Sequence, residues 1–189
     1  MLFLQIRMEK NKYFIAIVPP NPLQQELMGL KQELSLNFNT RGALRSPAHI
    51  TLHMPFDLEG KKEARFLDAV SQLSFKVHPF EIFLSDFGVF EPRVLFVNLN
   101  PSESLLSLRE MLVQWVKSNF AIYNQSDDIR GFHPHITIAF RDFKKQMFYA
   151  AWAQFKTRVF SGSFICNEIQ LLKFESGKWI PVSAIPLIQ

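Results

Sequence analysis

The sequence predicts an α+β protein with a duplicated, two-lobed fold. Each lobe is expected to be an antiparallel sheet with helices on its outer face, with a central cleft on a pseudo-twofold axis. Three repeated features predict this: His-Ile-Thr occurs at 49–51 and again at 135–137, a buried strand followed by Asn-Pro precedes each copy, and a Lys-Lys pair follows each copy. The internal repeat covers approximately 12–91 and 93–175, within a single bilobal domain of residues 1–189.

Each half is expected to begin with a buried strand and then a helix. The strands are YFIAIVP at 13–19 and VLFVNLN at 94–100, followed by Asn21-Pro22 and Asn100-Pro101. Asn as N-cap with Pro at the first helical position begins a helix. Residues at helical spacing then continue through Leu23, Leu27, Leu30, Lys31 and Leu34 in the first half, and through Leu105, Leu108, Leu112, Trp115, Val116 and Phe120 in the second.

The two His-Ile-Thr segments are the next strands. Alternate residues of a strand point to the same face, so His49 and Thr51 share one face, with Ile50 directed into the core. His135 and Thr137 repeat the pattern. The chain has five His and four Thr, and random placement would give only about 0.1 such pairs. We expect the two strands to lie side by side at the centre of the fold.

Helices and further strands complete each half. A helix begins at each Lys-Lys pair, and a hairpin turn is expected at Ser176-Gly177. The later strands are 76–90, 163–174 and 178–187.

The composition is that of an ordinary globular protein. Hydrophobic residues make up 48% and charged residues 20%, which argues against disorder. Cys166 is the single cysteine, which excludes an intramolecular disulfide and a cysteine-based zinc cluster and fits a cytoplasmic location. The start, MLFLQIRMEKNK, lacks the apolar core of a signal peptide, and no apolar run approaches the ~20 residues of a membrane span. We expect a monomer that does not bind membranes, and the net charge of +4 slightly favours anionic partners.

Two histidines that share one site can catalyse cleavage of a phosphodiester. One neutral imidazole acts as general base and one imidazolium as general acid, because both forms exist near neutral pH. Threonine hydroxyls can donate hydrogen bonds to the non-bridging oxygens as charge develops there. This chemistry needs no metal and no cofactor.

The same residues resemble the two-histidine (2H) phosphoesterase superfamily, in its 2′–5′ RNA ligase-like and RNA 2′,3′-cyclic phosphodiesterase branch. The segments KYFIAIVPP, PAHITLHMPF, FGVFEPRVLFVNL and FHPHITIAF carry the resemblance. It implies that His49 and His135 are acid and base and that Thr51 and Thr137 bind phosphate. It also implies metal-independent hydrolysis of 2′,3′-cyclic phosphates or 2′–5′ linkages at the ends of RNA or nucleotides, with 2′–5′ ligation as the reverse reaction.

One position departs from that family. RNA-directed relatives commonly carry Arg five residues after the second motif histidine, where this chain has Phe140. Arg141 follows, and on a regular strand it would share the face of His135 and Thr137.

Other residues near the motifs are candidates for substrate binding. Together with Arg141, Arg45 could contact a phosphate, Tyr13 and Phe132 could stack a base, and His53 could line the cleft because it shares the strand face of His49.

Two other functions fit the sequence. His133 and His135, with His49 or His53, could form a three-histidine zinc site with an open position, although the threonines would then have no role. The chain could also be a non-catalytic, ferredoxin-like module that binds RNA. The sequence leaves open which motif histidine is the acid, what the natural substrate is, and whether the product is a 2′- or 3′-phosphate.

Overall fold

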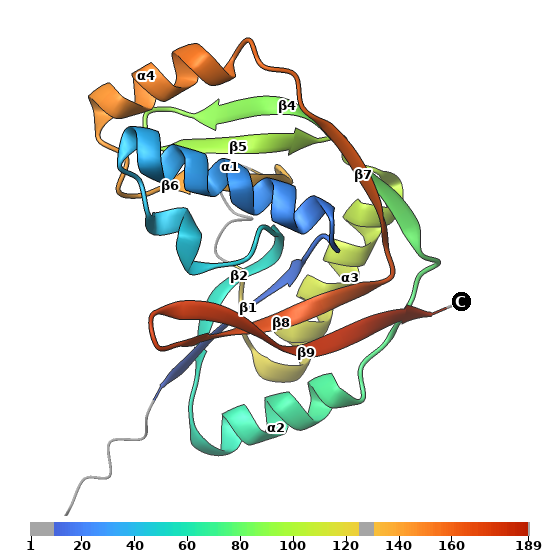
Figure 1. The fold of residues 1–189 in the computed structure, drawn as a ribbon. Helices are drawn as coiled ribbons and strands as arrows, with labels where there is room; N and C mark the ends of the chain where they lie inside the picture. Colours follow the sequence, from blue (N-terminus) through green and yellow to red (C-terminus); the bar gives the residue numbers. More distant parts are fainter. Residues whose placement is uncertain (1–9, 125–130, 189) are drawn as a thin grey trace, which may run out of the picture.

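The computed structural model describes residues 10–124 and 131–188 (Figure 1). Within these ranges nine strands follow one another across a single sheet in the order β3-β9-β8-β1-β2-β6-β5-β4-β7, and all neighbours are antiparallel except β3 and β9. None of the helices in these ranges is both long and apolar enough to cross a membrane. The strands are β1 (Asn11–Ile17), β2 (Ile50–Leu58), β3 (Phe75–Lys76), β4 (Phe80–Phe90), β5 (Val94–Leu99), β6 (His135–Phe140), β7 (Ser161–Cys166), β8 (Glu168–Glu175) and β9 (Lys178–Ile188).

The two His-Ile-Thr strands lie side by side at the middle of this sheet, as predicted. β2 and β6 run antiparallel and pair at one position, Ile50 with Ile136, which are equivalent residues of the two motifs. By contrast, β1 and β2 pair along almost their whole length. The two groups of strands therefore join at a narrow seam, and the symmetry of the repeat passes through the Ile50–Ile136 pair.

Each half of the chain places its last strand in the other half's part of the sheet. β4 belongs to the first half but pairs with β5, and β8 belongs to the second half but pairs with β1. The boundary expected between 91 and 93 falls in the short turn that joins β4 to β5. Antiparallel strands joined by a short turn pair with each other, so this hairpin connects the two repeats, and neither group of strands is one contiguous half of the chain.

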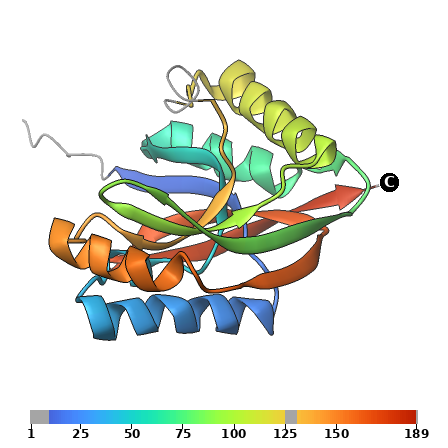
Figure 2. The ribbon, with the colours of Figure 1, turned by 90° about the horizontal axis from the view of Figure 1, so that it is seen from above.

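The helices lie in two pairs on opposite sides of the molecule (Figure 2). One pair covers the strands around β6 and β5, and the other covers β2 and β9. In the second pair, the Phe66 ring meets the Trp115 and Phe120 rings at 6.2 and 4.9 Å. The predicted α+β class with outer helices is confirmed. The first pair is α1 (Leu23–Phe38) with α4 (Lys145–Phe155), and the second is α2 (Gly60–Ser71) with α3 (Glu103–Phe120).

The helix starts differ slightly from the sequence prediction. Pro22 is the N-cap of α1, and Ser102, rather than Asn100, is the N-cap of α3. The Ser102 hydroxyl accepts a hydrogen bond from the Leu105 N–H at 3.2 Å, which satisfies one of the free N–H groups of the first turn. The turn at Ser176-Gly177 is as predicted, with φ of 50° and 82°.

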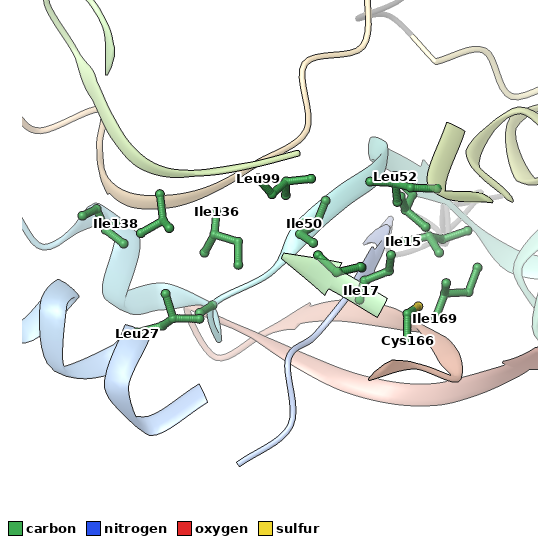
Figure 3. Close-up of a cluster of buried hydrophobic side chains, with 14 of the residues drawn as sticks. Ile15, Ile17, Leu27, Ile50, Leu52, Leu99, Ile136, Ile138, Cys166 and Ile169 are labelled. Atoms are coloured by element: carbon green, nitrogen blue, oxygen red, sulfur yellow. The ribbon is translucent and has the colours of Figure 1, made fainter. Parts of the chain in front are cut away.

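In the main core, side chains of the central strands pack together with side chains of the helices (Figure 3). Ile50 and Ile136 are completely buried in it, together with Ile15, Ile17 and Leu27. Full burial of one such side chain stabilises a fold by roughly 1.5–3 kcal/mol. The motif isoleucines therefore fix which way their neighbours in each motif must point.

A loop of the first half is bound to the end of β6 in the second half. The Asp142 carboxylate accepts hydrogen bonds from the Thr40 hydroxyl (2.8 Å), the Arg41 N–H (2.7 Å) and the Gly42 N–H (3.0 Å). A Cβ on Gly42 would overlap the Phe140 carbonyl oxygen, so glycine permits this close approach. The bonds hold the chain that leads to His49 beside the strand that carries His135.

Replacing Asp142 with alanine should destabilise the fold. Thr40 is only 3% exposed. Its hydroxyl and the backbone N–H groups of Arg41 and Gly42 would all lose a charged acceptor, at a cost of about 2 kcal/mol. Urea unfolding monitored by circular dichroism measures this. Asp68→Ala removes an exposed carboxylate on α2 and is the matched control; equal unfolding midpoints for the two variants would contradict the role of Asp142.

Candidate active site

The four motif side chains lie on one face of the sheet at the seam. Ile50 and Ile136 point into the core, so the residues that flank them point the opposite way, and all four are partly exposed. If the antiparallel register of the Ile50–Ile136 pair is extended by one residue on each side, His49 lies across from Thr137, and His135 across from Thr51. The two histidines are thus diagonal neighbours, and in a regular antiparallel pair the Cβ atoms of diagonal neighbours lie somewhat less than about 7–8 Å apart.

Both imidazoles are held in the same way by the backbone. The Nδ1 atom of His49 lies 2.8 Å from the Pro47 carbonyl oxygen, and Nδ1 of His135 lies 2.7 Å from the His133 carbonyl oxygen. Because a carbonyl can only accept a hydrogen bond, each Nδ1 must carry the proton. In the neutral ring, Nε2 then has the free lone pair, and this is the nitrogen that can exchange a proton with a substrate.

A phenylalanine from the neighbouring strand packs against each imidazole. Phe14 of β1 lies 4.7 Å from His49, and Phe96 of β5 lies 4.8 Å from His135, measured between ring centroids. A Cβ on Gly88 would overlap the Phe96 ring, so the glycine leaves room for that ring. Apolar packing on one side and a fixed Nδ1 on the other restrict both imidazoles.

This environment favours the neutral form of both histidines. The pKa of His49 is lowered to about 4, chiefly by burial and also by the charges of Lys31 and His135, while the hydrogen bond to Pro47 opposes the shift. Burial also lowers the pKa of His135, and the nearby His133 adds to the effect. An anion bound between His49 and His135 would raise both pKa values, because a negative charge stabilises imidazolium.

Both motif strands bulge immediately after the threonine. Thr51 pairs with Ala16 and His53 with Ile15, which leaves Leu52 without a partner; on β6, Ile138 is skipped in the same way. A bulge reverses the alternation of faces. The expectation that His53 shares the face of His49 is therefore wrong.

His53 instead belongs to the core. It is 1% exposed, its ring lies 5.1 Å from that of Phe56, and its Nδ1 is 2.9 Å from the Met54 carbonyl oxygen. Burial lowers the pKa of His53, and the Arg109 charge contributes. It does not line the face that carries the motif histidines.

The bulge also changes the position of Arg141. With the alternation reversed, Phe140 rather than Arg141 returns to the face of His135 and Thr137, and it is 38% exposed there. Arg141 lies beyond the end of β6 with φ of 68°, and its guanidinium is 4.9 Å from the Phe140 ring centroid. The expected strand position of Arg141 is wrong.

The other three candidates for substrate binding differ in their exposure to solvent. Tyr13 is 1% exposed and its hydroxyl donates to Glu63 at 2.5 Å, so it cannot stack a base. Phe132 packs against the main core, with the Arg109 guanidinium 4.4 Å from its ring centroid. Arg45 is exposed, at the end of the short helix η1 (Gly42–Arg45) that precedes His49.

Lys31 is a site residue whose role the sequence analysis missed. Its Nζ is bonded to the carbonyl oxygen that also binds His49, and the side chain is 2% exposed. The available signal was a lysine among the core-facing leucines of α1.

The structure gives no support to the three-histidine zinc site. Among residues 10–124 and 131–188, no three His, Cys, Asp or Glu side chains come together as ligands for a metal ion. The inward position of His53 removes one of the proposed ligands.

Residues 19–178 match the 2′-5′ RNA ligase superfamily. A Bacillus licheniformis protein named "Putative phosphoesterase" is 26% identical over 130 residues, which are 68% of this chain and 70% of that protein. A Bacillus pumilus protein of the same name is 25% identical over 130 residues, covering 68% and 69% of the two chains.

Solved structures share the fold. Escherichia coli LigT complexed with 3′-AMP superimposes with a TM-score of 0.66 at 22% identity, covering 96% of this chain and 100% of that chain. A protein of Thermus thermophilus gives a TM-score of 0.65 at 17% identity, covering 93% and 97%.

Replacing His49 with glutamine should make the free energy of unfolding depend less on pH. The pKa of His49 is about 4 in the folded chain and near 6.5 when unfolded. Between these values the unfolded chain binds a proton that the folded chain does not, so stability falls as the pH falls through this window. Between pH 7 and pH 4 the wild type should lose roughly 3 kcal/mol more than the variant.

Urea unfolding at several values between pH 4 and 7 measures the difference. His78→Gln changes an exposed histidine between β3 and β4 and should follow the wild type. Parallel stability curves for the wild type and His49→Gln would contradict the lowered pKa.

Proposed function

The chain belongs to the 2′-5′ RNA ligase superfamily and is a two-histidine phosphoesterase, and we propose that it hydrolyses 2′,3′-cyclic phosphates or 2′–5′ linkages at the ends of RNA or nucleotides, without a metal or cofactor. The observation that carries the proposal is the pair of imidazoles on one sheet face, each with Nδ1 bonded to a carbonyl oxygen. Ligation, the reverse reaction, would use the same groups.

The reaction needs two proton transfers on opposite sides of the phosphorus. One neutral imidazole takes a proton from water through Nε2 while the water oxygen bonds to phosphorus. The other imidazole, protonated, gives its proton to the ribose oxygen as the P–O bond breaks, which leaves a phosphate monoester. The positions of His49 and His135 on the two sides of the seam suit this in-line arrangement.

The threonines supply hydrogen bonds for the phosphoryl oxygens. Thr51 and Thr137 lie across from the two histidines on the same face. Their hydroxyls would donate to the non-bridging oxygens as negative charge develops there. We also propose that Arg45 and Arg141, both exposed near the ends of the motif segments, attract the phosphate chain of the substrate.

An RNA-binding module without catalysis is the alternative. It predicts that a double variant, His49→Ala with His135→Ala, keeps its RNA affinity and that no turnover is found with any substrate. The phosphoesterase proposal predicts turnover by the wild type on at least one member of a panel of 2′,3′-cyclic nucleotides and 2′–5′-linked dinucleotides.

Each single change of His49 or His135 to alanine should reduce kcat on such a substrate by roughly 10²–10⁴-fold, because one proton transfer is lost. His78→Ala, at an exposed position outside the site, is the control and should keep full turnover. All assays run in excess chelator, and turnover by the wild type should persist. Activity that survives both motif changes would refute the proposal.

The pH profile of kcat/KM should be bell-shaped, with its maximum on the acid side of pH 6.5. Burial lowers the pKa of both histidines in the free protein, so the protonated partner becomes scarce as the pH rises. The kcat profile reports the substrate complex, where the phosphate raises both pKa values, and should lie at higher pH. A kcat/KM that stays constant from pH 5 to 8, with chemistry rate-limiting, would exclude the acid–base pair.

A further inference from the structure

Lys31 is a buried lysine in the middle of α1. The side chain is 2% exposed and faces the core among leucines. Its Nζ donates hydrogen bonds to the carbonyl oxygens of Ala43 (3.1 Å), Ser46 (3.0 Å) and Pro47 (3.0 Å). A lysine is almost never buried without such partners, so these three bonds explain how it is tolerated, but not why it is present.

The carbonyl of Pro47 connects Lys31 to the catalytic face. Its oxygen accepts from the Lys31 ammonium and also from Nδ1 of His49 at 2.8 Å. Two donors on one oxygen lie within about 6 Å of each other, a distance at which a positive charge acts strongly on an imidazole. Lys31 therefore affects both the position and the charge of His49.

The other half of the repeat gives its histidine the same kind of backbone hydrogen bond but a different charged neighbour. Nδ1 of His135 is bonded to the His133 carbonyl oxygen, and the charged group that acts on it is the His133 imidazole. The lysine in the last turn of α3, Lys117, is exposed, in contrast to Lys31 of α1, and its Nζ lies 5.6 Å from the Tyr123 ring centroid. The two histidines are thus related by the repeat but have different charged neighbours.

We propose that Lys31 is a positioning residue that fixes the ring of His49 through the Pro47 carbonyl and keeps this imidazole neutral, so that the two histidines are not interchangeable. The proposal rests on the proposed function, in which one histidine must be neutral and the other protonated. Lys31 itself does not touch the substrate.

Lys31 can keep His49 neutral only while its own amine is protonated. The titratable groups that face His49 are Lys31 from α1 and His135 from β6. Burial lowers the pKa of Lys31 to about 7, which is still above the ordinary value of 6.5 for histidine. At pH 6.5 and below, most of Lys31 is therefore the ammonium, and its charge opposes protonation of His49 in that range.

The test is an NMR titration of the histidine ring nitrogens in the wild type, Lys31→Met and Lys31→Gln. In the wild type, His49 should titrate below His135. Both variants should raise the midpoint of His49 by about one pH unit or more, leave that of His135 within the error, and move one limb of the kcat/KM profile by the same amount. Lys117→Met, which removes an exposed lysine from α3, should change neither midpoint.

The outcomes separate this inference from the proposed function. A His49 midpoint that stays the same in a folded Lys31 variant overturns the inference, as does an equal shift of both histidines. If neither motif histidine affects turnover, the proposed function fails instead. Lys31→Gln retains a donor for one carbonyl, so it provides the titration should Lys31→Met not fold. The titration of the wild type tests the inference without either Lys31 variant, because equal midpoints for His49 and His135 would by themselves overturn it.

Discussion

The pairing of Ile50 with Ile136 is the constraint on which the site depends. It is the single pair through which β2 meets β6, and both side chains are completely buried. Burial of the isoleucines directs the flanking histidines and threonines away from the core. Antiparallel pairing then places each histidine across from the threonine of the other motif. A shift of one residue in this register would turn all four polar side chains into the core.

The backbone before each motif provides the second level of order. In both copies the residue two places before the histidine offers its carbonyl to Nδ1, and the segment contains a proline, Pro47 or Pro134. Proline restricts the backbone, so the acceptor is fixed before a substrate arrives. The rings need no reorganisation to present Nε2, which is the condition for efficient proton transfer at a preorganised site.

The sequence was sufficient for the parts of the site that follow from simple alternation. It predicted the shared face of His49 and Thr51, the central position of both motif strands and the outer helices. It did not predict the bulges, because the extra residues, Leu52 and Ile138, are ordinary strand formers with no glycine to mark them. The errors for His53 and Arg141 both come from this one omission.

Other errors had different physical origins. The residue type of Tyr13 suggests a stacking role, but its hydroxyl is satisfied by Glu63 inside the fold. The role of Lys31 depends on a carbonyl oxygen sixteen residues further along the chain, and side-chain to backbone contacts of this kind leave no pattern in the sequence. The exchange of β4 and β8 between the repeats also escaped, because the predicted boundary at 91–93 separates β4 from β5, although the short turn between these strands makes them a hairpin.

That exchange has a consequence for how the protein could be divided. A fragment that stops at the β4–β5 turn would carry β4 without its neighbours β5 and β7, and would leave β1 with an uncovered edge where β8 belongs. The remaining fragment would have the complementary defects. Each half of the chain therefore depends on a strand of the other half to complete its part of the sheet, so a cut at this turn leaves neither fragment with a full set of strand neighbours.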